Sequence, residues 1–415
     1  MEINKIHLKN IRCFDDFTFE FDGNNDSALI AGDNGTGKST ILRCLAMSLC
    51  DESSAAALFR ELHGSIIKKY SKNKEAFIDL YLKDGKKYYI IETKFTRIRK
   101  LERLKQTIYL GKVKKNRTIG QELFPWHLIF IAGYGAGART LGSGSIDSYL
   151  PIDAVYTLFR YDEPLQNPEL ALRRYESEYL NETKELSQNT NSGLDNFLTM
   201  IRDILNLSDN DQVLLTKKGI EVRGPWGKTE LESLGDGYKS TITWVLDLIG
   251  RRLIFGKTLD PKRMTGIVLI DEIEQHLHPK WQLRIMDLIT TAFPKMQFII
   301  TTHSPLVISG SSGVKTYRIE KGASSGLDID GWRVEDIYRD VMGMDSQRPK
   351  DILNDIKEFQ SLDFERLKNE LNKNQDKRYL ELKTILKNKL HGNDPLLQLI
   401  KLENITKNIS DDKNK

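Results

Sequence analysis

Features that would place a protein in several common classes are scarce or missing here. Three cysteines in 415 residues are too few, and odd in number, for a disulfide framework, so we expect reduced thiols in apolar surroundings at Cys13, Cys44 and Cys50. No apolar run approaches the ~20 residues that span a membrane. The opening MEINKIHLKN lacks the apolar stretch of a signal peptide. We therefore expect a cytoplasmic protein with no membrane contact.

A strong excess of either charge is also missing. The net charge of +4 is too small to indicate a nucleic-acid partner by itself. The distribution is less even, because residues 94–117 hold ten lysines and arginines and one acidic residue, Glu102. Such a run can neutralise phosphates, which would allow DNA contact through 94–117. It can equally cover the outward faces of a solvated hairpin, and the sequence favours neither interpretation.

The clearest positive signal is a strand, a glycine-rich loop and a helix in immediate succession. Residues 28–31 (ALIA) are apolar, the loop reads GDNGTGKS, and apolar residues then recur at helical spacing from Ile41. This is the pattern GxxxxGK[ST] in the setting that nucleoside triphosphate binding requires. Glycines allow the backbone N–H groups of such a loop to line a concave nest for phosphate oxygens. The sequence therefore predicts ATP binding.

Individual roles follow from the chemistry of this Walker A loop. Lys38 is expected to reach the β- and γ-phosphates and to assist catalysis there, and Ser39 to hold Mg²⁺ through its hydroxyl. The new helix directs its positive end at the same anion. The residues of this stretch that we expect to contact ATP are Gly32, Asn34, Gly35, Thr36, Gly37, Lys38, Ser39 and Thr40.

Two later strands carry the remaining expected catalytic groups. The apolar run 266–270 ends in Asp271 and Glu272, which predicts a Walker B strand when read together with the loop. Asp271 is expected to hold Mg²⁺, and Glu272 to orient and deprotonate the attacking water. Because side chains alternate along a strand, neighbouring carboxylates can face the metal and the γ-phosphate. A further buried run, 297–302, ends at His303.

Two other stretches invite a chemical interpretation. His276 and His278 have a metal-like spacing, but no third ligand is near them, so a loop at a dimer contact is the better interpretation. Residues 128–132 predict a buried strand that leads into the glycine-rich GYGAGAR. The glycine spacing is wrong for a dinucleotide site, and no helix is predicted there. Arg139, which ends this stretch, either lies near the nucleotide or ties down the loop.

Together these motifs resemble the ABC-type ATPases of the structural-maintenance-of-chromosomes, RecF and overcoming-lysogenization-defect group. Chains of that group open with a strand pair and an N-[FI]-[RK]-x-F turn, here Asn10 to Phe14, before the Walker A loop. The resemblance implies that Arg12 lies near the nucleotide and that His303 contacts the γ-phosphate. It also implies that two heads sandwich ATP, as a homodimer or a larger homo-oligomer. The partner head would contribute its signature motif, here Ser233, Gly235 and Gly237.

This sequence departs from the family pattern in four places. Gly235 stands where the signature has serine, and no glutamine follows residues 128–132 to complete the metal shell. The charged stretch 166–207 is helical in pattern but has no sustained heptads, so a long coiled-coil arm is not expected. Glu320 lies too close to the acidic pair at 328–330 for the nuclease domain of some relatives. We read the two as the ends of a hairpin and expect no nuclease site.

Within this group, the sequence of residues 331–349 most resembles the PtuA ATPases of Septu antiphage systems and of some retrons. That family implies an ATP-dependent sensor of antiviral defence that controls a separate HNH nuclease subunit, which is PtuB-like. A RecF-like DNA-binding repair ATPase is the main alternative. A transporter subunit is a third, and the tail and the missing glutamine argue against it.

The predicted fold is α/β, an ABC-type ATPase head in which an antiparallel lobe adjoins a parallel P-loop core. Strands are predicted at 3–9, 16–22, 76–82, 87–96 and 105–110, a hairpin at 213–223, and an apolar helix at 241–250. The expected domains are an N-terminal ATPase lobe (1–150), a helical insertion (151–210), a C-terminal ATPase lobe (211–330) and a helical tail (331–415).

Overall fold

The computed structural model describes most of the chain and separates it into two compact units, Met1–Met342 and Gly343–Lys415. The residues that it does not describe are 22–26, 112–116, 138, 146–147, 168–171, 173–188, 209, 217–218, 225–226, 231–232, 234–235, 257, 321, 345–347, 369 and 403–415. No described helix has the length and apolar character to cross a membrane.

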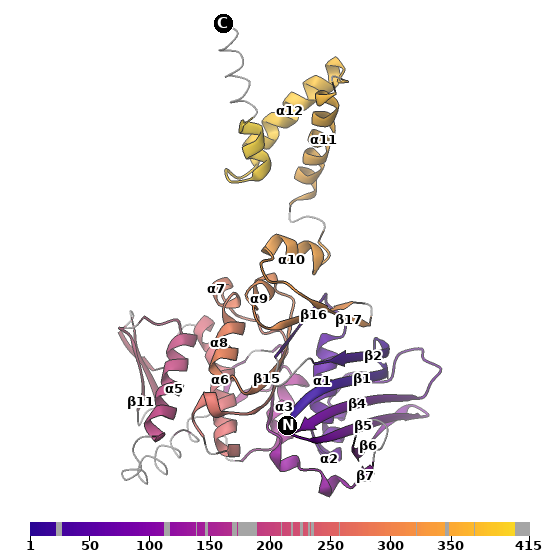
Figure 1. Cartoon of the computed structure of the whole chain (residues 1–415), viewed down its shortest axis with the longest axis vertical. Coiled ribbons are helices and arrows are strands. Elements are labelled where there is room, and N and C mark those ends of the chain that lie inside the picture. Colours follow the sequence, from indigo (N-terminus) through magenta and orange to yellow (C-terminus); the bar gives the residue numbers. More distant parts are fainter. Residues whose placement is uncertain are drawn as a thin grey trace. The chain divides into compact units, whose positions relative to one another are not determined.

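The first unit opens with an antiparallel sheet of six strands in the order β2-β1-β4-β5-β6-β7 (Figure 1). Its strands are β1 (Glu2–Ile11), β2 (Phe14–Glu20), β4 (Glu75–Asp84), β5 (Lys87–Ile98), β6 (Leu101–Leu110) and β7 (Arg117–Ile119). Alternating buried and partly buried positions in β4 match the period of two that its sequence shows. The predicted hairpin between β4 and β5 is confirmed, and Gly85 turns it with φ +58°.

The second sheet is almost entirely parallel and has the order β17-β16-β3-β15-β14-β8. Its strands are β3 (Ala28–Ala31), β8 (Ile131–Tyr134), β14 (Gly266–Ile270), β15 (Met296–Thr302), β16 (Lys315–Glu320) and β17 (Ala323–Leu327). Only the β16–β17 hairpin is antiparallel. The predicted hairpin between Glu320 and the acidic pair at 328–330 is thereby confirmed.

The parallel sheet is buried on both faces, which explains why its strands read as continuous apolar runs. Val268 and Ile270 of β14 belong to one core, with residues of α5 (Asn189–Ile204), α6 (Asp236–Gly256) and α8 (Ile285–Ala292). Ile267 and Leu269 belong to the other, with α1 (Lys38–Ser48) and the antiparallel sheet. Figure 1 shows α5, α6 and α8 on one side of β15 and the antiparallel sheet on the other. These layers give the expected α/β architecture, with an antiparallel lobe beside a parallel core.

Smaller elements complete the first unit. The helices are α2 (Glu52–Arg60), α3 (Pro151–Val155), α7 (Pro279–Gln282), α9 (Pro305–Ser309) and α10 (Val334–Asp340). Two parallel strands, β9 (Leu141–Ser145) and β10 (Leu165–Asn167), form a short sheet. A three-stranded sheet contains β11 (Gln212–Thr216), β12 (Gly219–Gly224) and β13 (Gly227–Glu230). The β11–β12 hairpin was predicted, whereas β13 was not.

Several local predictions are wrong. Cys13 is exposed, because it lies in the turn between β1 and β2, whereas Cys44 and Cys50 are buried as expected. The strand predicted at 128–132 begins only at Ile131, after a 3₁₀ turn at Trp126–Leu128. The stretch expected to be helical from 166 begins as a strand, β10, because it pairs with β9. The helix predicted at 241–250 already begins at Asp236.

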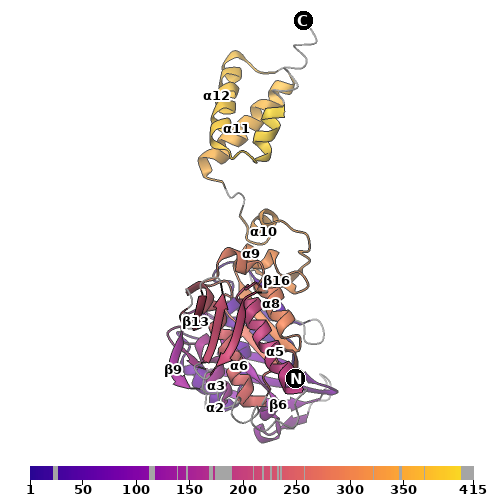
Figure 2. The same ribbon diagram turned by 90° about the vertical axis from the view of Figure 1, so that its left-hand side faces the viewer.

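The second unit is helical. It contains α11 (Lys350–Leu367), α12 (Lys373–Lys389) and a further helical stretch at 395–402. Figure 2 shows α11 and α12 side by side. The apolar faces of α11 and α12 and the stretch 395–402 form a small core of their own, made of Ile356, Phe359, Leu362, Tyr379, Leu382, Leu386 and Ile400. Asn372 begins α12 with a capping box, which satisfies N–H groups of its first turn.

Candidate functional site

The carboxyl ends of four parallel strands meet at one edge of the sheet. β3 ends at the Walker A loop, β14 at Asp271, β15 at His303, and β8 at the glycine-rich loop with Arg139. In open α/β sheets this edge is where ligands bind, because the loops that leave the strands converge there. Segments more than two hundred residues apart in sequence therefore meet at a single site.

The Walker A loop has the backbone conformation that its glycines allow. Gly35 (φ +83°) and Gly37 (φ +104°) adopt left-handed angles that other residues rarely adopt. A Cβ on Gly37 would lie 2.5 Å from Cζ of Phe14 and 2.7 Å from Sγ of Cys13. The turn between β1 and β2 therefore supports the loop directly. The Cys13 thiol also donates to the carbonyl of Thr36, at 3.7 Å.

The side chain of Lys38 folds back onto the loop that precedes this residue. Its Nζ donates to the carbonyl oxygens of Gly32 (2.5 Å) and Asp33 (2.9 Å). Burial lowers the pKa of Lys38, while the negative charges of Asp271 and Glu272 act in the opposite direction. The structure thus brings the predicted lysine and both predicted carboxylates into one electrostatic environment.

The two Walker B carboxylates diverge through a turn. Asp271 is 1% exposed, and its Oδ1 accepts a hydrogen bond from Oγ1 of Thr301 at 2.6 Å. Glu272 has φ +51°, an uncommon angle for a non-glycine residue, and its backbone N–H donates to the same hydroxyl at 2.9 Å. β14 ends at Ile270, so our expectation that strand alternation separates the two side chains is wrong. The left-handed turn separates them.

Arg139 stabilises this turn from the loop that follows the neighbouring strand, β8. Its side chain is buried, and Nη2 donates to the carbonyl oxygens of Asp271 (2.7 Å) and Glu272 (3.1 Å), while Nε donates to that of Gly135 (3.3 Å). Burial lowers the pKa of Arg139 to about 10. Of the two roles left open by the sequence, tying down a loop describes these contacts. The loop that Arg139 holds is the one with the predicted catalytic carboxylates.

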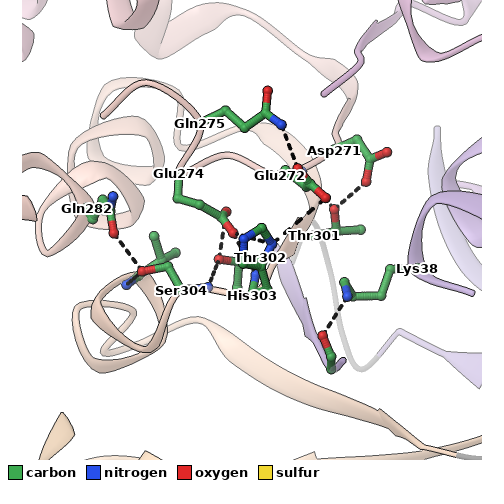
Figure 3. Close-up of polar contacts among 12 residues, drawn as sticks. Lys38, Asp271, Glu272, Glu274, Gln275, Gln282, Thr301, Thr302, His303 and Ser304 are labelled. Carbon is green, nitrogen blue, oxygen red and sulfur yellow. Dashed lines mark hydrogen bonds and ion pairs between the residues drawn. The ribbon is translucent and has the colours of Figure 1, made fainter. Parts of the chain in front are cut away.

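His303 contacts a carboxylate that the sequence did not single out. Its Nδ1 lies 3.0 Å from Oε1 of Glu274 and 3.8 Å from Oε1 of Glu272 (Figure 3). The hydrogen bond with Glu274 raises the pKa of His303 above its ordinary value, although partial burial opposes the shift. The other glutamate, Glu272, is held by Gln275, whose Nε2 donates to Oε2 of Glu272 at 2.6 Å.

The donor set also fits a hard divalent cation. The hydroxyl of Ser39 and the buried carboxylate of Asp271 are oxygen ligands of the kind that Mg²⁺ takes from proteins when phosphates and water complete its shell. Thr301 occupies one oxygen of Asp271 and so fixes the carboxylate. No group of three or more His, Cys, Asp or Glu side chains within the described residues forms an all-protein metal site.

The remaining predicted residues differ in their surroundings, and one of them lies outside the described residues. Arg12 donates through Nη2 to the carbonyl of His63 at 3.0 Å, and burial lowers its pKa. Ser233 is exposed, and Gly237 lies in the first turn of α6. Gly235 lies outside the described residues. Asn34 and Gly35 are exposed and Thr36 is half-buried, whereas Thr40 is buried in α1.

Sequence reasoning missed Glu274, Gln275 and Thr301 as parts of the site. Glu274 and Gln275 lie in the phrase EQHLHP, which we read only as a contact loop. Thr301 ends a buried apolar run, where a hydroxyl is unusual enough to have drawn attention. The signal available was the polar pair Thr301–Thr302 at the end of a strand that is otherwise apolar.

Two family models match the segments of the chain that contain these residues. Residues 5–125 match the model described as "AAA domain", and residues 151–309 match "AAA domain, putative AbiEii toxin, Type IV TA system". Together the two matches span most of the chain, which therefore carries AAA-family ATPase domains.

Among curated proteins, the chain is similar to Septu PtuA proteins and retron ATPases. It is 29% identical over 313 residues to Septu protein PtuA of Bacillus mycoides (strain KBAB4), covering 74% of this chain and 39% of that protein. It is 31% identical over 196 residues to Septu protein PtuA of Bacillus thuringiensis, covering 43% and 46%. It is 40% identical over 107 residues to Retron Vc95 probable ATPase of Vibrio cholerae serotype O1 biovar El Tor, covering 25% and 21%. The chain thus spans less than half the length of each of these relatives.

Similar solved structures include heads of structural-maintenance-of-chromosomes proteins. The head domain from Thermotoga maritima has 16% identity and a TM-score of 0.46, with 79% of this chain and 98% of that chain covered. The SmcHead bound to the C-winged helix domain of ScpA has 18% identity and a TM-score of 0.49, with the same coverage.

Proposed function

We propose that the protein binds and hydrolyses ATP as the regulatory subunit of a prokaryotic antiphage defence complex. Nucleotide-dependent pairing of its heads would control a separate HNH nuclease subunit of the PtuB-like kind. The observation that supports this proposal is the meeting of Lys38, Asp271, Glu272 and His303 at one sheet edge. The similarity to Septu PtuA proteins and retron ATPases supports the defence setting.

In the proposed reaction the chain positions ATP and a water molecule. Lys38 neutralises charge on the β- and γ-phosphates, and Glu272 orients the attacking water and accepts its proton. The protonated ring of His303 donates a hydrogen bond through Nε2 to the γ-phosphate as negative charge develops there. Mg²⁺, when held by Ser39 and Asp271, supplies further positive charge at the phosphates. Thr301 and Arg139 keep the two carboxylates apart during the reaction.

The site of a single head is open on one side, which is consistent with a second copy completing it. Asp33, Asn34 and Gly35 at the tip of the loop are exposed. The helix α6, which begins at Asp236, would present its first N–H groups to the γ-phosphate held by the partner head. Self-association would therefore require bound ATP.

Measurement of the oligomeric state tests this proposal. In the full chain with Mg²⁺, ATP should drive self-association, and Glu272→Gln should accumulate the associated form because it binds ATP but hydrolyses it slowly. Lys38→Ala should abolish both binding and association. If Lys38→Ala left nucleotide affinity and self-association unchanged, the proposal would be wrong. Co-purification of an HNH nuclease expressed from a neighbouring gene tests the partner.

A second candidate function, DNA binding by a RecF-like repair ATPase, is favoured by one surface. The backbone N–H of Arg97 donates to the carbonyl of Lys74 at 2.8 Å, which joins residues 68–74 to the β5–β6 hairpin. Tyr70 on this surface is 90% exposed, so it could stack on a base. Its exposed cations are Lys69, Lys72, Lys74, Arg99, Lys100, Arg103 and Lys105. Lys112, Lys114 and Lys115 of the predicted run lie outside the described residues.

Salt-dependent DNA binding distinguishes this candidate. Alanine at Lys72, Lys74 and Arg99 should weaken binding and lower the salt slope by about one for each phosphate that is no longer neutralised. Alanine at three exposed lysines of α12, namely Lys373, Lys377 and Lys387, is the matched control and should leave the slope unchanged. Absence of DNA binding by the intact protein would exclude a direct DNA-binding role.

A further inference from the structure

We propose that Glu274 is a positioning residue that holds a proton on Nδ1 of His303 and fixes the ring orientation, so that Nε2 faces the γ-phosphate and donates to it when the ring carries protons on both nitrogens. This inference rests on the proposed ATPase function of the same site. It assigns the two glutamates of the turn after β14 to different tasks. Glu272 acts on water, and Glu274 acts only through the histidine.

Glu274 accepts two hydrogen bonds and makes one close ion-pair contact, all with two consecutive residues. The backbone N–H of His303 donates to Oε1 at 2.7 Å, and Nδ1 of the same residue lies 3.0 Å from that oxygen. Oγ1 of Thr302 donates to Oε2 at 2.8 Å. The glutamate is 7% exposed, and although burial would raise its pKa, these hydrogen bonds hold the pKa below its ordinary value. The carboxylate is therefore ionised and can only accept hydrogen bonds.

An acceptor at this distance fixes one proton on Nδ1, so Nε2 donates to a phosphate only when the ring carries a second proton. Because the carboxylate of Glu274 only accepts, Nδ1 of His303 must donate, as in other carboxylate–imidazole pairs. The remaining nitrogen, Nε2, makes no hydrogen bond to another group in the part of the chain that the structure describes. The side chain of His303 is 45% exposed. The positive charge of Lys38 acts on the pKa of His303, because the ring lies on the same side of the site as the Walker A loop (Figure 3).

Glu272 cannot perform this task in the observed arrangement. Its Oε1 lies 3.8 Å from Nδ1 of His303, which is beyond hydrogen-bond distance. Its Oε2 already accepts from Gln275 at 2.6 Å. Nδ1 of His303 lies 3.0 Å from Oε1 of Glu274 but 3.8 Å from Oε1 of Glu272, so the ring interacts with Glu274. Oε1 of Glu272 is then available for the attacking water.

The turn that carries Glu274 is attached to the strand that carries His303. The N–H of Ile273 donates to the carbonyl of Thr301 at 3.2 Å, and the N–H of Leu277 closes the turn on the carbonyl of Glu274 at 3.0 Å. Glu274 is thus held by backbone contacts on both sides, as a positioning residue requires.

The first test is a double-mutant cycle on ATP turnover by the full chain. Glu274→Gln keeps the shape but removes the charge, and it should lower kcat by about 10–100-fold, the usual effect of losing such a supporting carboxylate. ATP affinity should remain within about twofold, because Glu274 does not contact the nucleotide. Adding Glu274→Gln to His303→Ala should cost nothing further. Independent, multiplicative losses would overturn the proposal.

Two more variants separate positioning from folding. Glu274→Asp retains the charge and should recover part of the kcat lost in Glu274→Gln, whereas equal losses in both would contradict the assignment. Asp51→Asn changes a carboxylate that also accepts from two consecutive residues, Ser53 and Ser54, but outside the site. It is the matched control and should leave kcat unchanged.

A measurement without ATP keeps this inference distinct from the proposed function. Nitrogen-15 chemical shifts of His303, recorded at a pH at which the ring is neutral, should show a protonated Nδ1 in the wild type and a mixture of tautomers in Glu274→Gln. If the wild type hydrolyses no ATP, the proposed function fails while this spectrum still tests the contact. If His303 has the same tautomer in both proteins, the positioning role is wrong.

Discussion

Two regions of this molecule are stabilised in opposite ways. At the carboxyl edge of the parallel sheet, the buried groups are polar or charged, and Arg139, Asp271 and Glu274 each have specific hydrogen-bond partners. In the helical unit Gly343–Lys415, the buried cluster consists of apolar side chains and one tyrosine. Its exposed faces carry charges such as Lys377 and Glu381.

The comparison shows that the sheet edge requires specific side-chain geometry, whereas the core of the helical unit requires only the burial of apolar side chains. A buried charge without a partner is very unfavourable, so the groups at the sheet edge tolerate few arrangements. The uncommon φ of +51° at Glu272 persists there because Thr301 and Arg139 hold the turn on both sides. Apolar packing in the helical unit is less directional, so surface changes there should be tolerated. Substitutions in the two regions should therefore differ in their effects on catalysis.

The largest effect is expected at the sheet edge. Glu272→Gln removes the proposed base and should lower kcat by about 10²–10⁴-fold while ATP binding persists. Single-turnover hydrolysis together with nucleotide-binding titration measures both quantities. Normal turnover in this variant would remove Glu272 from its proposed role.

A substitution in the helical unit should leave catalysis unchanged, even if its cost in folding free energy is similar to the loss of transition-state stabilisation in Glu272→Gln. Leu382→Ala leaves a cavity in the small apolar core and should destabilise that unit by about 2–5 kcal/mol. ATP turnover should stay within about twofold, because none of the residues packed there belongs to the cores of the head. Amide hydrogen exchange resolved by segment measures the first quantity. A large loss of turnover would show that the two regions are not independent.

Arg139→Lys tests how strictly the geometry at the sheet edge is specified. Lysine keeps the positive charge but cannot reproduce the planar fork that reaches two carbonyl oxygens. Displacement of the Glu272 turn should lower kcat by about 10–100-fold with less effect on ATP affinity. A lysine variant with wild-type kcat would show that a positive charge at position 139 is enough to hold the Glu272 turn.

The smallest effect concerns pH. The hydrogen bond to Glu274 and the charges of Glu274 and Glu272 raise the pKa of His303, while partial burial and Lys38 oppose the shift. The stabilising contribution of the protonated ring is therefore fully present below about pH 6.5, the ordinary value for histidine, and is lost as pH rises through the raised pKa. kcat should decline over the same range. In Glu274→Gln the decline should begin at lower pH, and an unchanged profile would count against the pair.

Most of the secondary structure around the site could be predicted from the sequence. The strand at 28–31, the glycine loop and the helix that begins at Lys38 follow from local pattern, since an apolar run, two left-handed glycines and helical periodicity act over few residues. The same reasoning failed for β10 and β13, because short strands depend on partners elsewhere in the chain.

By itself, the sequence determined which strands end in polar groups, and hence that phosphate-binding chemistry belongs to this chain. Only the tertiary structure decided that Glu274 rather than Glu272 contacts His303, that a left-handed turn separates the Walker B carboxylates, and that Arg139 holds this turn. The physical reason is that these contacts cross between parallel strands. Their distances depend on how the strands are ordered and aligned, and local sequence does not encode that information.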